Sequence, residues 1–173
     1  MRYTITALLG KQQGASDSFR FKVAMPSLIG ELAPLTKPVC AQVKLLKLPH
    51  EINVQLKDLV AAFNVFCIRC TKSFESTLTI PFVEREFLID LHERDIGPSE
   101  DVFYVDLENH EIVLDEMIRQ EIVLHFPYNP VCSDGCLGLC SHCGVNLNET
   151  QCDCRPQQEK SDRIWPFRGL KVL

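Results

Sequence analysis

The chain has 173 residues, of which 46% are hydrophobic and 24% are charged, and its formal net charge is −5 at pH 7. No stretch approaches the roughly 20 consecutive apolar residues that a membrane-spanning helix requires, and the first residues contain neither the apolar run nor the cleavage site of a secretory signal. We therefore expect a soluble cytoplasmic protein in which one domain of ordinary size carries a smaller appendage.

The charges are distributed unevenly along the chain. Residues 1–72 carry ten Lys and Arg against four Asp and Glu, residues 73–130 carry three against fourteen, and residues 131–173 carry five against five. A basic first part can contact phosphate groups, whereas the acidic middle would repel them. This distribution predicts a one-sided contact with nucleic acid or, alternatively, a solvated polar surface on a strand face.

The first 36 residues are broken by several glycines and prolines, and within them only residues 3–9 predict a strand. The pattern is clearer from residue 39 onward. Residues 39–48 and 51–56 are rich in β-branched residues and leucine, and a Pro-His pair separates them. These two segments therefore predict a β-hairpin.

A long alternating strand is predicted over residues 76–90, after an almost wholly apolar strand over residues 58–67. The first half of the alternating strand is expected to place Leu78, Ile80 and Phe82 on one face. The buried face then changes near Pro81, so that Phe87 and Ile89 become the buried pair. Such a change of face predicts a bulge or a bend in the strand.

Helical periodicity follows a further short strand, which we expect at residues 102–107. Leu114, Met117, Ile118 and Ile122 recur at helical spacing, and acidic residues in the first turn oppose the positive end of the helix dipole. We expect one helix near residues 114–124. The predicted fold is α+β: a mostly antiparallel β-sheet or barrel-like domain over residues 1–128 with one packed helix, then a Cys-rich, zinc-ribbon-like segment over residues 129–173.

Six of the nine cysteines lie within residues 132–154, among glycines that let the backbone turn tightly around an ion. A cytosolic chain keeps its thiols reduced, so clustered cysteines indicate metal ligands or redox groups rather than disulfides. Zinc takes four ligands, and a site made of thiolates alone leaves no position for a water or a substrate. The cluster therefore predicts a structural zinc site.

A second pair of cysteines, Cys67 and Cys70, lies far upstream with the two-residue spacing of a metal knuckle. Eight cysteines make two sets of four, and the simplest partition joins this pair to the start of the cluster. We thus predict two structural zinc ions, one bound by Cys67, Cys70, Cys132 and Cys136, the other by Cys140, Cys143, Cys152 and Cys154. Cys40 is left over and is expected to be a small core residue.

The spacing leaves alternatives open. His142 lies between two ligands and could replace one of them, and one member of the closely spaced Cys152 and Cys154 could be spare. Four cysteines also bind iron–sulfur clusters. Cys67 and Cys70 have the spacing of a redox pair as well, although that motif usually opens a helix and strands are expected on both sides here.

Several segments of the chain together resemble the bacterial and plastid YceD family, known as the large ribosomal RNA subunit accumulation protein. They are the Cys67-Ile-Arg-Cys70 pair with the long strand after it, the acidic strand region, the helix in residues 112–127, the Cys-rich block in residues 130–148 and the closing residues 162–170. The resemblance implies a short C-terminal helix and a role in the synthesis, processing or stability of large-subunit (23S) rRNA. It also implies partners among that rRNA, its precursor particles and ribosomal proteins.

Three hypotheses about function follow. The first is a non-enzymatic ribosome-assembly factor without a small-molecule substrate, because no catalytic constellation is present. Its basic residues would contact RNA phosphates or a ribosomal protein: Lys44, Lys47, Lys57, Arg69 and Lys72. The second is a cysteine-based redox or metal-sensing protein in which mild oxidation joins Cys67 to Cys70. The third is a nuclease with Glu84, Glu86, Asp90 and Glu93 around an ion, although these carboxylates are better explained as a solvated strand edge.

Overall fold

The structure of the protein, a computed structural model, describes residues 1–24, 33–89 and 102–154. Two helices and seven strands lie within these residues. The helices are α1 (Thr6–Leu9) and α2 (Asp115–His125). The strands are β1 (Arg2–Thr4), β2 (Ser16–Val23), β3 (Val39–Lys47), β4 (Glu51–Phe66), β5 (Ser73–Leu88), β6 (Phe103–Tyr104) and β7 (Glu111–Val113).

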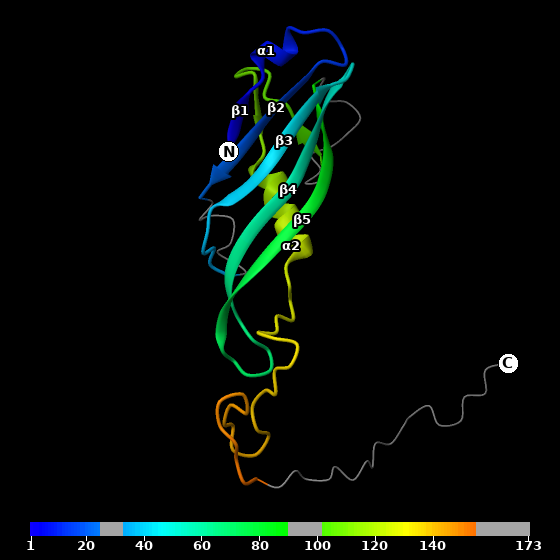
Figure 1. Ribbon diagram of the computed structural model, residues 1–173. Helices are drawn as coiled ribbons and strands as arrows, with labels where there is room; N and C mark the ends of the chain where they lie inside the picture. The colour runs from blue at the N-terminus through cyan, green and yellow to red at the C-terminus, as the bar shows by residue number, and fades with distance from the viewer. Residues whose placement is uncertain (25–32, 90–101, 155–173) are drawn as a thin grey trace, which may run out of the picture.

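The main sheet has five strands in the order β2-β3-β4-β5-β6, and a second sheet pairs β1 with β7. In the main sheet the strands pair antiparallel, except for β5 and β6, which are parallel. Figure 1 shows α2 behind the main sheet and the two long strands β4 and β5 running past the helix toward the Cys-rich tail. The expected antiparallel sheet with one packed helix is present. Among the described strands β2 and β6 lie at opposite edges, so the pairings form an open sheet and not a closed barrel.

The core lies between the main sheet and α2. The inward side chains of β4, such as Ile52, Val54 and Leu56, are fully buried, as are Ile118 and Ile122 of the helix. Each buried side chain of this size stabilises the fold by about 1.5–3 kcal/mol relative to exposure. We call the opposite surface of the main sheet, which faces solvent, the outer face.

Two predicted segments form one strand. The hairpin expected at residues 39–48 and 51–56 is β3 and the first part of β4, and β4 then continues without a break through the expected apolar strand as far as Phe66. The β3–β4 register shifts between Cys40 and Gln42, where the pairing becomes irregular. Asp58 lies in this β-bulge with a φ of 52°, a value that is uncommon outside glycine but is more often adopted by Asp.

The bulge changes the inward face of both long strands at the same level. In β4, Lys57 and Asp58 are both exposed, and in β5 the neighbouring Pro81 and Phe82 are both exposed. The predicted change of face near Pro81 is thus confirmed. Phe82, however, was expected with Leu78 and Ile80 on the buried face, and it lies on the outer face instead.

The beginning of the chain differs from expectation. Residues 3–9 do not form one strand, because β1 ends at Thr4 and α1 buries Leu8 together with the adjacent Ile5. The segment expected to be irregular contains β2, an eight-residue strand. Cys40, expected in the core, is half-buried and pairs with the exposed Lys22 on the outer face.

The end of the domain agrees with the expected helix, since α2 spans Asp115–His125. The strand expected at residues 102–107 is shorter, with only Phe103–Tyr104 in β6. Beyond α2, Phe126 packs edge to face on Phe63 of β4, with ring centroids 5.2 Å apart. The short C-terminal helix expected at residues 162–170 lies outside the described residues, and the division of the chain at residue 128 stays a prediction.

Candidate metal centres

Both Cys-x-x-Cys pairs form the same backbone turn. In the first, the Thr71 N–H donates to the Cys67 carbonyl at 2.9 Å, and the Cys67 N–H donates to Lys72 O at 2.9 Å. In the second, the Gly144 N–H donates to the Cys140 carbonyl at 2.9 Å, and the Cys140 N–H donates to Val145 O at 2.8 Å. Each turn brings the two sulfurs of its pair onto the same side. The two pairs are therefore equivalent metal knuckles.

The residue after each knuckle has a positive φ, 59° at Thr71 and 73° at Gly144. Glycine adopts this conformation without a Cβ clash, whereas a β-branched residue does so only under constraint. The first knuckle retains Thr71 in this conformation, and the hydroxyl donates to the Cys70 carbonyl at 2.7 Å. The turn is therefore determined by its surroundings and not by local preference.

The first group of thiols, which we call the inner group, consists of Cys67, Cys70, Cys132 and Cys136. Their Sγ atoms all lie within 4.8 Å of one another. The Cys67 and Cys136 sulfurs are 3.8 Å apart, and those of Cys70 and Cys132 are 3.6 Å apart. A Zn–S bond of about 2.3 Å places the sulfurs of a tetrahedral site about 3.8 Å from one another. The spacing of the inner group therefore fits one tetrahedral ion.

The inner group joins the tail to the tip of the β4–β5 hairpin. Ile68 N–H donates to Pro130 O at 3.0 Å, and Leu139 N–H donates to Arg69 O at 3.0 Å. Gly138 permits this approach, since its φ is 78° and a Cβ there would lie 3.1 Å from the Arg69 carbonyl oxygen. These backbone contacts and the four thiols come from the same two segments, so an ion bound by the inner group would also hold the tail on the hairpin tip.

Asn148 supports the inner group, although the sequence analysis did not single it out. Its Nδ2 lies 3.4 Å from the Cys136 sulfur, and its Oδ1 accepts the Leu137 N–H at 2.8 Å. Side chains that hydrogen-bond to a ligand orient it and tune the metal. A polar residue shortly after the second knuckle was the available signal, but spacing alone does not show that it turns back toward Cys136.

The thiols of the inner group differ in how readily they ionise. Burial raises the pKa of Cys67, but backbone N–H groups bonded to its sulfur, that of Cys132 foremost, bring this pKa down to about 6. A backbone N–H of Lys72 lowers the pKa of Cys70, but burial and the other three thiols raise it to about 12. Four thiolates this close need a positive charge between them, which a divalent metal ion supplies.

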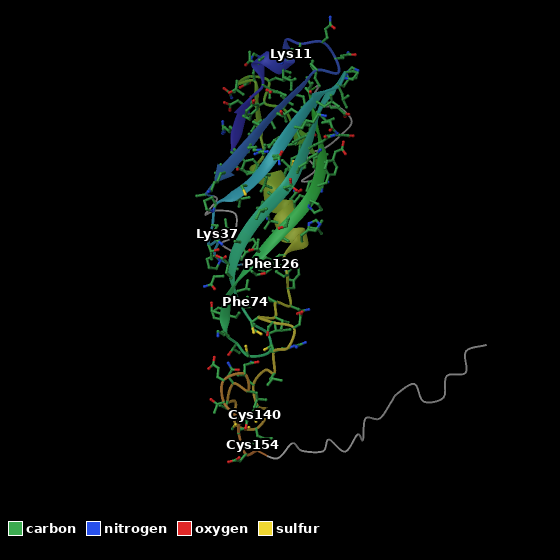
Figure 2. The ribbon with its side chains drawn as sticks, viewed as in Figure 1. Lys11, Lys37, Phe74, Phe126, Cys140 and Cys154 are labelled. Atoms are coloured by element: carbon green, nitrogen blue, oxygen red, sulfur yellow. The ribbon has the colours of Figure 1, made fainter. Side chains whose placement is uncertain are left out.

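The second group of thiols, which we call the outer group, consists of Cys140, Cys143, Cys152 and Cys154. Their Sγ atoms also lie within 4.8 Å of one another. Backbone N–H groups of Cys143 and His142 lower the pKa of Cys140 to about 6, and the Cys143 thiol raises the pKa of Cys154 to about 12. Figure 2 shows Cys140 and Cys154 at the far end of the tail, beyond Phe74 and Phe126.

The two groups differ in exposure. Cys67, Cys70 and Cys136 of the inner group are at most 6% exposed, whereas Cys143 and Cys154 of the outer group are exposed. Both offer four soft sulfur ligands, enough to fill a tetrahedral coordination sphere, which suits a structural zinc ion. An iron–sulfur cluster places inorganic atoms among its four thiolates and would hold the sulfurs farther apart. The geometry is compatible with zinc at both groups.

The predicted basic residues do not form one surface. Lys44 and Lys57 are exposed on the outer face, whereas Arg69 and Lys72 lie at the hairpin tip, about 30 Å farther along β4 at 3.3 Å per residue. The Arg69 guanidinium donates to two tail carbonyls, and Lys72 lies 4.0 Å from Glu149. Lys47 is half-buried, and its ammonium donates to the carbonyl of Leu9 at the end of α1 and to that of Lys11.

The carboxylates considered for a nuclease do not gather in the described part of the chain. Glu84 lies on the outer face and accepts hydrogen bonds from Asn53 and Gln55. Glu86 is exposed two residues farther along β5. Asp90 and Glu93 lie outside the described residues. Among the described residues, the two thiol groups have ligand atoms close enough to share an ion, and Glu84 and Glu86 belong to no such set.

Residues 58–173 match the family described as "Large ribosomal RNA subunit accumulation protein YceD". The chain belongs to the YceD family. The YceD match begins at Asp58, in the bulge of β4, and continues through the helix and both thiol groups. The family described by this name thus shares with the chain the part that forms the hairpin tip and the candidate metal centres.

Curated relatives of the chain include one that carries the YceD name. A maize protein named "Large ribosomal RNA subunit accumulation protein YCED homolog 1, chloroplastic" is 33% identical over 72 residues, which are 41% of this chain and 24% of the maize protein. This chain thus spans about a quarter of the maize protein's length. An uncharacterized protein of Mycobacterium tuberculosis is 29% identical over 143 residues, or 82% of this chain and 68% of the relative, and one from Mycobacterium bovis matches to the same extent.

No solved structure matches the chain. Within the part of the chain that the structure describes, neither helix has the length and apolar character that crossing a bilayer requires.

Proposed function

We propose that the protein is a non-enzymatic factor in biogenesis of the large ribosomal subunit, which promotes the synthesis, processing or stability of 23S rRNA. The observation that carries the proposal is the match of residues 58–173 to a family named for accumulation of the large ribosomal RNA. The name of the maize relative, which belongs to the same family, is consistent with it. The proposed location is the cytoplasm, and the proposed partners are large-subunit rRNA, its precursor particles and ribosomal proteins.

The proposed role of the thiol groups is structural. We propose one zinc ion in the inner group, held by Cys67, Cys70, Cys132 and Cys136, and one in the outer group, held by Cys140, Cys143, Cys152 and Cys154. The ions would hold the tail in shape, the inner one on the β4–β5 hairpin, so that the whole chain presents one fixed surface to its partner. The support for this proposal is the sulfur spacing within each group.

Sedimentation of cell extract on a sucrose gradient tests the proposed function. A tagged chain should travel with precursors of the large subunit, and sequencing of the RNA recovered with it should be enriched in large-subunit over small-subunit rRNA. Raising the salt concentration should weaken the association if phosphate contacts contribute to it. A tagged chain that stays at the top of the gradient and enriches no large-subunit rRNA would contradict the proposal.

A second candidate function is metal or redox sensing through the outer group. The observation that favours it is the exposure of Cys143 and Cys154, because an accessible thiolate is oxidised more readily than a buried one. Mild oxidation should then release one zinc ion and change the rRNA level in cells. A disulfide between Cys67 and Cys70 requires oxidation of two buried thiols and is the weaker form of this hypothesis.

A further inference from the structure

The outer face carries a row of four side chains, one from each of four neighbouring strands. Arg20 of β2 pairs with Gln42 of β3, Gln42 pairs with Lys57 of β4, and Lys57 pairs with Phe82 of β5. Directly paired residues point to the same face of a sheet, and all four are exposed. The row therefore presents a guanidinium, an amide, an ammonium and an aromatic ring to solvent, side by side.

The bulge at Asp58 is what turns Phe82 to the outside. Without the change of face in β4 and β5, the alternation that buries Ile80 would bury Phe82 as well. Instead 47% of Phe82 is exposed. A phenylalanine that faces water contributes less to the free energy of folding than one in the core. β-Bulges often turn a side chain toward a functional surface. Phe82 is thus placed for contact with another molecule.

The surroundings of the row are mainly basic. Lys44 follows Gln42 by two residues on the same face, and Lys22 follows Arg20 in the same way. Within the described residues, no ion pair engages these lysines, Arg20 or Lys57. A depression of about 410 Å³ on this surface is lined in part by Arg20, Lys44 and Lys57.

Two carboxylates adjoin the row and limit its extent. Asp58 accepts a hydrogen bond from the Gln42 amide at 3.3 Å. Glu84 follows Phe82 on β5 and accepts from the Asn53 amide at 2.6 Å. The basic residues lie on β2, β3 and β4, whereas Phe82 and Glu84 both lie on β5. A polyanion would therefore lie over β2 to β4 and reach Phe82 at its border.

We propose that this outer face binds single-stranded RNA directly, with Phe82 stacked on a base and Arg20, Lys44 and Lys57 in contact with phosphates. This inference rests on the proposed function, which supplies RNA as the partner. A basic surface with an exposed aromatic ring is the usual combination for single strands, because every base has a face for stacking. In an RNA duplex the bases are already stacked, so the ring has nothing to contact.

Fluorescence anisotropy of the full-length, metal-loaded chain tests the proposal. The probe is a short labelled oligoribonucleotide of mixed sequence, used as a single strand and as a duplex with its complement. The single strand should bind more tightly than the duplex. With three phosphate contacts, the logarithm of the binding constant should fall with the logarithm of the salt concentration with a slope of about −2, from about −0.7 per contact on a single strand.

Substitutions at Phe82 separate stacking from simple apolar contact. Phe82→Leu should weaken binding of the single strand about 5- to 150-fold, the range for loss of one stacked base, whereas Phe82→Trp should retain it. The matched control is Phe66→Leu, because Phe66 is also an exposed phenylalanine of the same sheet, near the hairpin tip. Phe66→Leu should bind as the natural chain does. Both positions are exposed, and thermal denaturation checks that each variant folds.

Substitutions of the basic residues test the phosphate contacts. Arg20→Gln and Lys57→Gln should each weaken binding and make the salt slope shallower by about 0.7. Lys57→Arg should retain most of the affinity. The matched control is Lys11→Gln, since Lys11 is an exposed lysine that precedes β2 and lies at the opposite end of the molecule from the tail (Figure 2).

The outcomes distinguish this inference from the proposed function. If the natural chain binds neither form of RNA but still sediments with large-subunit precursors, the inference is overturned while the proposed function stands. Equal binding of duplex and single strand, or unchanged binding by Phe82→Leu, would also overturn it. Binding of the oligoribonucleotide without sedimentation on precursors would support the RNA surface and contradict the proposed function.

Discussion

The cysteines of the two groups differ in how much of each thiol is exposed to water. Cys136 is 6% exposed and contacts Cys67 and Asn148, whereas Cys143 is exposed at the end of the tail. Loss of a buried ligand would remove the ion proposed for the inner group and leave the remaining thiols unable to ionise together. The same loss at the outer group affects only the tail.

Cys136→Ser should therefore lower the free energy of unfolding by about 3–5 kcal/mol, as is typical for loss of a structural metal, and should lower the zinc content by one ion. Cys143→Ser should also lose one zinc ion but change the unfolding of the sheet by less than about 1 kcal/mol. Urea denaturation and elemental analysis measure the two quantities. Cys40→Ser is the control and should keep the natural zinc content.

Gly138 offers a second test at the scale of one residue. Its φ is 78°, and a Cβ at this position would lie 3.1 Å from the Arg69 carbonyl oxygen, so both the backbone conformation and the available space oppose a side chain. Gly138→Ala should destabilise the protein by about 1–2 kcal/mol. Gly135→Ala is the matched control, because nothing lies within 4 Å of a Cβ there. Equal denaturation midpoints for the two variants would contradict the close approach.

Between the elements, α2 and β5 are joined by an ion pair of Glu121 with Arg85. The Glu121 side chain is 5% exposed, whereas that of Arg85 is 40% exposed. Arg85→Leu would remove the guanidinium and leave the buried carboxylate with only the His125 ring, whose Nδ1 lies 3.7 Å from the other carboxylate oxygen, which should cost about 3 kcal/mol. The double variant Arg85→Leu/Glu121→Leu should recover most of that loss, since apolar residues can replace a buried pair. Urea denaturation measures the stability of both variants, and equal stabilities of the single and the double variant would contradict this account.

The elements also show what local sequence patterns can predict. The β3–β4 hairpin follows from two apolar segments around a turn, and α2 follows from the spacing of Leu114, Met117 and Ile118, because both signals are local. The alternation of Phe19 and Phe21 with polar residues was an equally local signal for β2, but the neighbouring glycines and prolines led to the wrong prediction. An apolar run such as the one around Ile5 fits a strand or a helix equally well.

Other features depend on contacts that local patterns do not contain. The position of Phe82 on the outer face results from the register of β4 against β3, which a pattern within β5 cannot show. The parallel pairing of β6 is likewise a property of the folded chain. The two sets of thiols could be predicted because zinc needs four ligands, but the support of Asn148 and the docking of Gly138 on Arg69 required the structure.

At the scale of the whole molecule, the sheet domain and the tail are held together where the inner group lies. Removal of metal should therefore occur in two steps. A chelator should take the first zinc ion quickly from the exposed outer group and the second slowly from the buried inner group. Near- and far-ultraviolet circular dichroism recorded with the zinc release should change mainly in the second step. Loss of both ions in one phase would contradict the difference between the groups.

The central claim is that the chain promotes accumulation of large-subunit rRNA and needs its inner thiol group to do so. The most direct measurement is the ratio of large- to small-subunit rRNA in cells that lack the protein, with and without a restored copy. The ratio should fall in its absence, recover with the natural chain and with Cys40→Ser, and stay low with Cys136→Ser. A ratio that does not change when the protein is removed would contradict the account.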